Sequence, residues 1–256
     1  MELSCLLLHG LGGTPFEMEP LAVALRDAGC SVRLSVLPGH GSTVDAYGAA
    51  RFRDWTGHAE AEYRALEAEG APVLVAGFSL GGILALHLAQ HFTPAGVAAL
   101  AAPVFLFRFF PWFVSDWRLC VLPLLARAYP RLSMPPRQPE AREIAPWRGH
   151  EEVIFPAQIG DLMRGAAVVR RGLGRVRAPL LLVQARGDRT CHPYNSWYIA
   201  SRAASRDVTL RLLDIREQRA GHHLITTHRE TRAAVARAVA LFARRVAETH
   251  DLPSSG

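Results

Sequence analysis

The sequence predicts an α/β domain with a mostly parallel central sheet that is flanked by helices and carries a small helical insertion. Short apolar runs alternate with segments of helical periodicity through the first 103 residues, and the alternation returns between residues 178 and 250. Repeats of this length are typical of parallel sheets with right-handed crossovers. Between residues 104 and 177 prolines recur and no clean strand pattern is present. We therefore expect a core of residues 1–103 and 178–250, with residues 104–177 as a cap or lid.

Four strands and three helices are expected before the insertion. The strands span residues 5–8, 32–37, 73–76 and 97–100. The run at 5–8 is continuously apolar, as expected where both faces of a sheet are covered, and the strand at 32–37 ends at Pro38. Apolar residues recur at helical spacing between these runs, over residues 16–28, 55–69 and 81–91.

Two strands and two helices are expected after the insertion. The strands span residues 180–183 and 208–213, the helices 196–204 and 230–248, and residues 251–256 form a tail that we expect to fray. The insertion itself is expected to be mostly helical and to sit over one edge of the sheet. It begins with a cluster of aromatic residues, namely Phe105, Phe107, Phe109, Phe110, Trp112, Phe113 and Trp117.

The composition excludes several chemistries. All 29 basic residues are arginine and the chain has no lysine, so neither a lysine Schiff base nor a Walker-type phosphate loop is possible. The formal net charge is +6, but the arginines are scattered through the chain without a block of like charges. We therefore expect no nucleic-acid partner.

Cysteine spacing and ligand patterns argue against metals and cofactors. Cys5, Cys30, Cys120 and Cys191 lie far apart without a C-x-x-C pair, so we expect free thiols in a reducing cytosol. No clustered Cys/His ligand set is present, and Pro15 interrupts the glycine series that a dinucleotide-binding loop needs.

No targeting or membrane-spanning segment is expected either. The apolar run at the N-terminus ends at His9 and is too short for a secretory signal. The apolar stretch over residues 104–126 is interrupted by charges and prolines, which excludes a membrane span. The oligomeric state is not indicated by any pattern in the sequence.

A candidate nucleophile lies in Gly77-Phe78-Ser79-Leu80-Gly81, which matches G-x-S-x-G. The motif follows the predicted strand 73–76 and precedes the predicted helix 81–91. A serine in this setting sits on a strained turn at the carboxyl edge of the sheet with its hydroxyl exposed, and the flanking glycines allow the strand and helix to approach closely.

A serine nucleophile needs a base and an acid that orients the base. Asp188 is the candidate acid, because it follows the predicted strand 180–183 and so lies at the same sheet edge as Ser79. The pair His222 and His223 offers two candidate bases, between which the pattern alone does not choose. We interpret His40 as a structural loop residue.

Two backbone amides are candidate donors to a developing oxyanion. The first belongs to Leu80, the residue after the candidate nucleophile, and the second to Leu11 in the glycine-rich loop after the first strand. His9 in that loop is expected to shape the backbone and not to react.

Together these residues resemble the α/β-hydrolase superfamily, and within it the small bacterial carboxylesterases and monoacylglycerol lipases. The resemblance rests on five motifs: Leu-Leu-Leu-His-Gly at 6–10, Pro-Gly-His-Gly at 38–41, Gly-Phe-Ser-Leu-Gly-Gly at 77–82, Val-Gln-Ala-Arg-Gly-Asp at 183–188 and His-Leu-Ile-Thr at 223–226. The last motif implies that His223 is the base. The chain departs from the family in having Gly221-His222 before this histidine and Thr227-His228 after the motif.

The resemblance implies a serine carboxylesterase with a Ser79–His223–Asp188 triad and an acyl-enzyme intermediate. We expect the aromatic part of the insertion to line an acyl pocket, with short to medium acyl esters or monoacylglycerols as substrates and weak contact of the cap with a lipid interface. The alternatives are a thioesterase, an acyltransferase or a carbon–carbon bond hydrolase on the same triad. A noncatalytic ligand-binding protein on the same fold is a further alternative.

Overall fold

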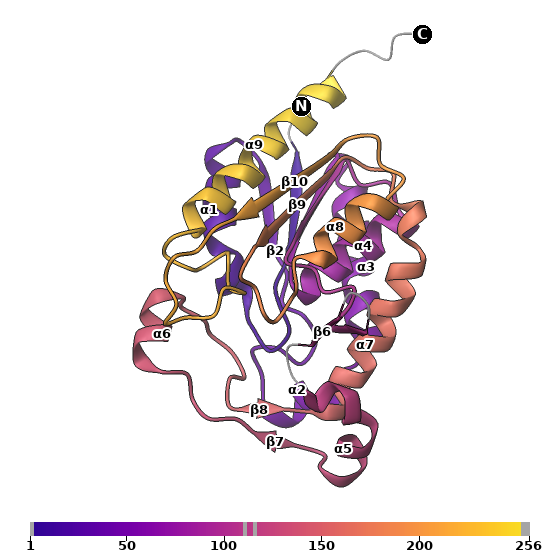
Figure 1. Ribbon diagram of the computed structural model, residues 1–256. Coiled ribbons are helices and arrows are strands. Elements are labelled where there is room, and N and C mark those ends of the chain that lie inside the picture. Colours follow the sequence, from indigo (N-terminus) through magenta and orange to yellow (C-terminus); the bar gives the residue numbers. More distant parts are fainter. Residues whose placement is uncertain (1–2, 110–111, 115–116, 252–256) are drawn as a thin grey trace.

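Six strands form the central sheet in the computed structural model, which describes residues 3–109, 112–114 and 117–251 (Figure 1). The strand order is β10-β9-β4-β3-β1-β2, and every neighbouring pair is parallel, which confirms the predicted sheet. The strands are β1 (Ser4–Leu8), β2 (Ser31–Leu34), β3 (Val73–Phe78), β4 (Gly96–Leu100), β9 (Leu180–Ala185) and β10 (Val208–Leu213).

Helices cover both faces of the sheet. On one face lie α1 (Glu19–Asp27) and α9 (Arg232–Asp251), and on the other lie α3 (Phe52–Ala68), α4 (Leu80–His91), α7 (Pro156–Arg171) and α8 (Tyr194–Arg202) (Figure 1). The central strands are continuously apolar because successive side chains point to opposite faces. Leu6 and Leu8 of β1 join the cluster beneath α3 and α4, whereas Cys5 and Leu7 join the cluster beneath α1 and α9.

The insertion, residues 104–177, joins β4 to β9. Its residues 119–155 lie at the carboxyl ends of the strands, whereas α7 packs along one face of the sheet (Figure 1). We predicted no strand in this segment, and that prediction is wrong, because the segment holds two short antiparallel ladders. Strands of two or three residues are too short to produce an alternating pattern in the sequence. The elements of the insertion besides α7 are β5 (Phe107–Phe109), β6 (Trp112–Val114), α5 (Leu122–Ala128), β7 (Leu132–Ser133), α6 (Pro139–Ile144) and β8 (Val153–Ile154), with 3-10 turns at Trp117–Val121 and Leu173–Arg175.

One helix was not anticipated between β2 and α3. The helix α2 (Val44–Ala49) is short, and the side chain of Thr43 caps it by accepting a hydrogen bond from the Ala46 amide at 3.2 Å. The strand β2 ends at Leu34, three residues earlier than predicted. These two changes leave residues 35–43 as a loop that reaches the carboxyl edge of the sheet.

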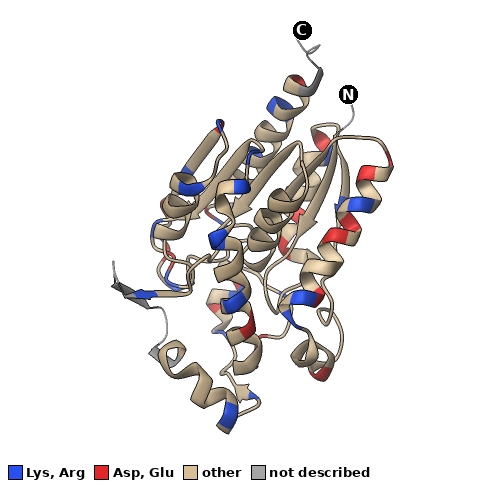
Figure 2. Cartoon of the chain, turned by 90° about the vertical axis from the view of Figure 1, so that its right-hand side faces the viewer, with Lys and Arg blue, Asp and Glu red and all other residues tan. Residues whose placement is uncertain are grey.

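Charged residues are distributed over the helices and loops of the chain, and the arginines do not gather on one element (Figure 2). Among the described residues, no helix combines the length and the apolar character that crossing a membrane requires. Residues 252–256, the end of the predicted tail, lie outside the described residues.

Candidate active site

Ser79 occupies the tight turn between β3 and α4. Its backbone angles, φ 54° and ψ −114°, lie in a region that side-chain-bearing residues rarely adopt. The glycines of the motif are required by space: a Cβ atom at Gly77 would overlap the carbonyl of Gly81, and one at Gly81 would overlap the carbonyl of Leu8. The turn therefore presents the Ser79 hydroxyl at the carboxyl edge of the sheet, as the sequence predicted.

His223 lies between Ser79 and Asp188. Its Nε2 atom is 3.0 Å from Oγ of Ser79, and its Nδ1 atom is 2.8 Å from Oδ2 of Asp188. Because an ionised carboxylate can only accept, Nδ1 carries the proton and Nε2 accepts from the serine hydroxyl. His222 points elsewhere, with Nε2 2.9 Å from the carbonyl oxygen of Glu217. The structure thus brings His223, and not His222, to Ser79.

Asp188 is held in the loop after β9 by several donors. The residue is 2% exposed. Oδ1 accepts the amides of Thr190 and Cys191, each at 2.8 Å, and Oδ2 accepts the Nε2 amide of Gln184 at 2.9 Å in addition to His223. A buried carboxylate with this many donors is fixed in orientation and stays ionised.

The electrostatics of this pair favour a charged histidine. Burial on its own lowers the pKa of His223, but the charge of Asp188 and the hydrogen bond to it raise that pKa above the ordinary value of 6.5. Burial raises the pKa of Asp188, but the His223 charge and the hydrogen bonds outweigh burial and lower it. The arrangement stabilises an imidazolium next to Ser79, which is the species that forms when histidine takes a proton from a hydroxyl.

The loop after β1, residues 9–13, lies beside Ser79 and carries the predicted oxyanion donor Leu11. In the described part of the chain, the amides of Leu11 and Leu80 donate no hydrogen bond to another group. The amide of Gly81 is bonded to the carbonyl of His9 at 3.1 Å, so this loop and the turn at Ser79 are tied together.

Two buried histidines shape this loop. Nε2 of His9 accepts the Leu37 amide at 3.2 Å, and Nε2 of His40 accepts the Gly12 amide at 3.0 Å. Burial lowers the pKa of His9 to about 3 and that of His40 to about 4, so both rings are neutral and can accept at physiological pH. Both histidines therefore hold the backbone of neighbouring loops in place through hydrogen bonds.

An apolar cavity of about 290 Å³ opens at Ser79. Among the residues that the structure describes, aliphatic side chains of the insertion form most of its wall: Leu106, Leu119, Leu122, Leu125, Leu132, Ile154, Pro156, Ile159 and Leu162. We expected aromatic residues here. Phe105 instead packs against Tyr198, at 4.9 Å between ring centres, and Phe107 lines a separate pocket. The side chains of Phe109, Phe110, Trp112, Phe113 and Trp117 lie outside the described residues.

A second, more polar cavity of about 390 Å³ also opens at His223. The two cavities share Leu11, Ile154, Ile159, Thr190 and His223, and so form two lobes of one cleft. We call them the apolar lobe and the polar lobe. The side chains that give the polar lobe its character are Tyr47, Arg137, Trp147, His150 and Glu151.

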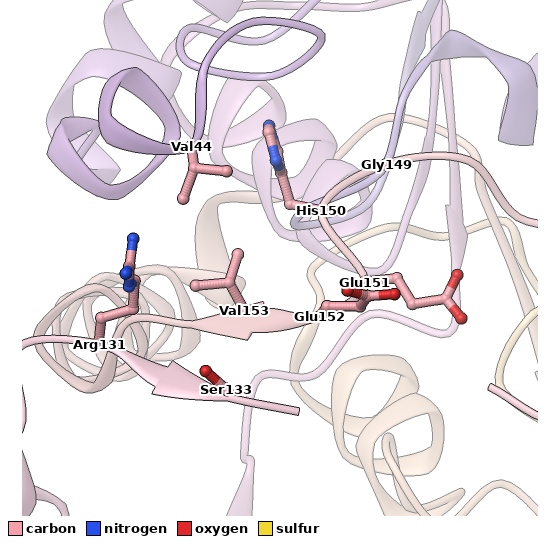
Figure 3. Close-up of a pocket in the computed structure, with 8 residues that line it drawn as sticks. All are labelled: Val44, Arg131, Ser133, Gly149, His150, Glu151, Glu152 and Val153. Carbon is pink, nitrogen blue, oxygen red and sulfur yellow. The ribbon is translucent and has the colours of Figure 1, made fainter. Parts of the chain in front are cut away.

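A third, outer pocket of about 370 Å³ lies between the start of α2 and the ladder of β7 and β8 (Figure 3). It shares His150, Glu151 and Val153 with the polar lobe, but none of Ser79, Asp188 and His223 lines it. The ring of His150, which lines both spaces, stacks on Tyr47 with 4.5 Å between centres.

Sequence reasoning missed several polar residues around the cleft. Arg137 and Trp147 come from the insertion, and Glu17 follows the loop at residues 9–13. No motif marks them, because each reaches the cleft only through the folded arrangement of the insertion. Among the residues that the structure describes, no group of three or more His, Cys, Asp or Glu side chains is placed to hold a metal ion.

Comparison with known proteins extends over nearly the whole chain. The family model for serine aminopeptidase, S33, matches residues 2–226. The thermostable monoacylglycerol lipase of Bacillus sp. (strain H-257) is 27% identical over 240 residues, which cover 93% of this chain and 90% of that protein.

Solved structures with the same fold include lipolytic proteins. One, described as LipS and LipT, two metagenome-derived lipolytic enzymes, has a TM-score of 0.79 and 25% identity, and the match covers 95% of this chain and 94% of that chain. A soluble variant of the monoglyceride lipase of Saccharomyces cerevisiae has a TM-score of 0.76 at 18% identity, with 96% and 87% covered. At 18% identity, the similarity to the yeast protein shows a shared fold alone.

Proposed function

The chain belongs to the serine aminopeptidase S33 family, in the lipase and esterase group of the α/β-hydrolase superfamily, and on that basis we propose that it is a serine carboxylesterase that hydrolyses monoacylglycerols and other short- to medium-chain esters. Enzymes of this group are serine hydrolases. The observation that carries the proposal is the pair of hydrogen bonds that joins Ser79, His223 and Asp188 where the two lobes meet.

In the proposed reaction Ser79 attacks the ester carbonyl carbon while Nε2 of His223 takes the hydroxyl proton. Asp188 holds the ring and stabilises the imidazolium. The amides of Leu11 and Leu80 donate to the oxyanion of the tetrahedral intermediate, where each donor contributes about 3 kcal/mol. His223 then returns the proton to the leaving alcohol, and water, activated by the same histidine, hydrolyses the acyl-enzyme.

The apolar lobe is the proposed acyl site. The leucine and isoleucine side chains described in its wall carry no hydrogen-bonding group, and each CH₂ buried there contributes about 0.8 kcal/mol. Because the insertion supplies most of this wall, we propose that residues 104–177 act as a cap that selects the acyl chain.

The polar lobe is the proposed alcohol site. Arg137 donates through Nη2 to the carbonyls of Ala141 and Ala145, each at 2.9 Å, whereas its Nη1 atom is buried without a partner among the described residues. A buried donor left unpaired costs about 1–3 kcal/mol. A hydroxyl of a glycerol group would satisfy it, and this supports a monoacylglycerol over an ester of a simple alkanol.

Two further proposals concern the surroundings of the enzyme. Leu124 and Tyr129 of the insertion are exposed, at 70% and 54%, and they support weak contact of the cap with a lipid interface that delivers substrate. Cys5, Cys120 and Cys191 are free thiols, and Cys120 is exposed, which supports the reducing cytosol as the proposed location.

Labelling with a fluorophosphonate tests the proposed function. We expect one label per chain, located at Ser79 by peptide mass spectrometry and absent from Ser79→Ala and His223→Ala. His222→Ala is the matched control, and it should be labelled like the parent protein. Labelling that persists in Ser79→Ala would contradict the proposal. Rates on matched oxoester and thioester substrates would then separate an esterase from a thioesterase.

A further inference from the structure

A buried carboxylate that the proposed reaction does not use lies beneath the loop at residues 9–13. Glu17 sits in the 3-10 turn Pro15–Met18 and is 1% exposed. Its Oε2 atom accepts the amide of Gly10 at 2.7 Å. Its Oε1 atom accepts the indole Nε1–H of Trp147, which lies 130 residues further along the chain. Each oxygen thus receives one donor, from two different parts of the fold.

The loop is shaped around this carboxylate. A Cβ atom at Gly13 would lie 2.6 Å from the carboxyl carbon and from both oxygens of Glu17, and one at Gly10 would lie 3.2 Å from Oε2. Gly13 also closes a turn by donating to the carbonyl of Gly10 at 3.2 Å. The glycines leave room for the Glu17 side chain directly under the peptide that precedes Leu11.

The other partner of Glu17 belongs to the insertion. Trp147 lines the polar lobe, and three residues later the amide of His150 donates to the carbonyl of Gly12 at 2.8 Å. The insertion therefore holds the loop on both sides of Leu11, through Glu17 at Gly10 and directly at Gly12. The position of the Leu11 amide depends on both contacts.

We propose that Glu17 is a positioning residue that transmits the placement of Trp147 in the insertion to the Leu11 amide of the oxyanion site. This inference rests on the proposed function, because it assigns the Leu11 amide to the oxyanion. A substrate alcohol in the polar lobe packs beside Trp147 and holds the indole against Glu17. The loop is then ordered at the moment when the carbonyl carbon reaches Ser79.

The chemistry of the two donors requires a carboxylate at this position. Ionised Glu17 only accepts, and so it satisfies both N–H groups. Burial raises the pKa of Glu17 to about 7 even though the bonds from Gly10 and Trp147 and the charge of His223 lower it, so the carboxylate form prevails above about pH 7. In Glu17→Gln only one of the two terminal atoms accepts, and the amide nitrogen must face an N–H group, either that of Gly10 or that of Trp147.

A double-mutant cycle with Glu17→Gln and Trp147→Phe tests the proposal on hydrolysis of p-nitrophenyl butyrate. We expect Glu17→Gln to lower kcat about 10- to 100-fold with KM changed less than threefold, since a displaced oxyanion donor affects the transition state more than the ground state. Trp147→Phe alone should lower kcat by a smaller factor. Combined with Glu17→Gln it should raise kcat, because phenylalanine removes the donor that opposes the new amide.

The matched controls are Glu19→Gln, an exposed acid two residues away, and Trp197→Phe, a tryptophan that is 56% exposed. Both should match the parent protein. Losses that multiply in the double variant, or a Glu17→Gln variant with the parent kcat, would overturn the proposal. If Glu17→Gln does not fold, the kcat values of Trp147→Phe and Trp197→Phe are compared instead. Equal kcat values would overturn the proposal.

Measuring Ser79→Ala beside the cycle distinguishes a failure of this inference from a failure of the proposed function. If Ser79→Ala retains activity, the proposed function fails and the assignment of the oxyanion site fails with it. If Ser79→Ala is inactive while the Glu17 and Trp147 effects are simply multiplicative, the triad stands and only the role of Glu17 is wrong.

Discussion

The sheet core and the insertion are built in different ways. In the core, β1, β3, β4 and β9 are buried at every residue, and the helices on both faces close two large apolar clusters. In the insertion, residues 119–155 contribute only a small cluster, in which Ala141, Ile144 and Ala145 pack with Ala220. The ladders there are two or three residues long.

This difference separates two tasks. The residues proposed to carry the chemistry follow core strands: Ser79 comes after β3 and Asp188 after β9. The insertion supplies most of the wall of the apolar lobe and most of the polar side chains of the second lobe. Segments with few buried contacts open at low free energy, so the selective walls can adapt while the reacting groups stay fixed. Changes to the triad in the core should therefore act on kcat for every ester. Changes to the insertion side chains that line the lobes, apart from Trp147, should act on the choice of substrate.

The largest expected effect comes from Ser79→Ala in the core. Loss of the nucleophile should reduce kcat roughly 10⁴- to 10⁶-fold on every ester, irrespective of acyl chain or alcohol. Steady-state rates on a panel of esters measure this, with the exposed Ser201→Ala on α8 as the control. A loss confined to some substrates would contradict the proposed division of roles between core and insertion, because Ser79 would then determine the choice of substrate.

Asp188→Asn should lower kcat about 10³- to 10⁴-fold and also change the pH dependence. His223 must be neutral to accept a proton, and Asp188 raises the pKa of His223 above 6.5. Activity of the parent enzyme should thus fall as the pH decreases through a value above 6.5. In the variant burial lowers that pKa, and the acid limb of kcat/KM should move to lower pH.

The control for Asp188→Asn is Asp214→Asn, a change at a side chain that is 77% exposed. It should leave both the rate and the acid limb unchanged. An acid limb that stays in place in Asp188→Asn would show that the observed pKa does not belong to His223.

In the insertion, Leu125→Trp should shift acyl-chain preference. The larger side chain reduces the apolar lobe, so kcat/KM for a dodecanoyl ester should fall about 10- to 100-fold relative to a butyryl ester. Arg127→Trp is the matched control on the same helix, because Arg127 is exposed and does not line the lobe. Equal losses on both esters would mean that the lobe does not hold the acyl chain.

The smallest expected effect is that of Arg137→Met on the alcohol. The ratio of kcat/KM for a monoacylglycerol to that for the ethyl ester of the same acid should fall about tenfold, since the donor for a glycerol hydroxyl is lost. Arg131→Met, in the outer pocket of Figure 3, is the control and should leave this ratio unchanged. An unchanged ratio in Arg137→Met would remove the polar lobe from the proposed alcohol site.

The core could be predicted from the sequence because its signals are local. A fully buried strand leaves a continuous apolar run, and Gly77 and Gly81 are needed wherever a strand and a helix meet so closely. Local sequence signals could not choose between His222 and His223, because adjacent residues share the same surroundings in the sequence. It came from the resemblance to a family, and the structure brings His223 to Ser79.

The rest of the site depends on contacts between distant segments. In the sequence Glu17 is an ordinary acid at the start of a helical segment. Only the folded structure shows that Trp147 donates a hydrogen bond to it. Phe105 was expected to line the acyl pocket, but composition says nothing about which side of a short segment faces the cleft. For Phe105 the preferred partners are Tyr198 and the guanidinium of Arg170, which lies 4.2 Å from the ring centre.

The backbone of Ser79 has a consequence for how this sequence can drift. A residue with a side chain at φ 54° and ψ −114° costs about 1–3 kcal/mol, and glycine would relieve most of that cost. Selection for stability alone would therefore replace this serine. A gene copy freed from the demand for hydrolysis is expected to lose Ser79 early and to become more stable as it does so. The presence of serine at position 79 therefore indicates continued selection for hydrolysis.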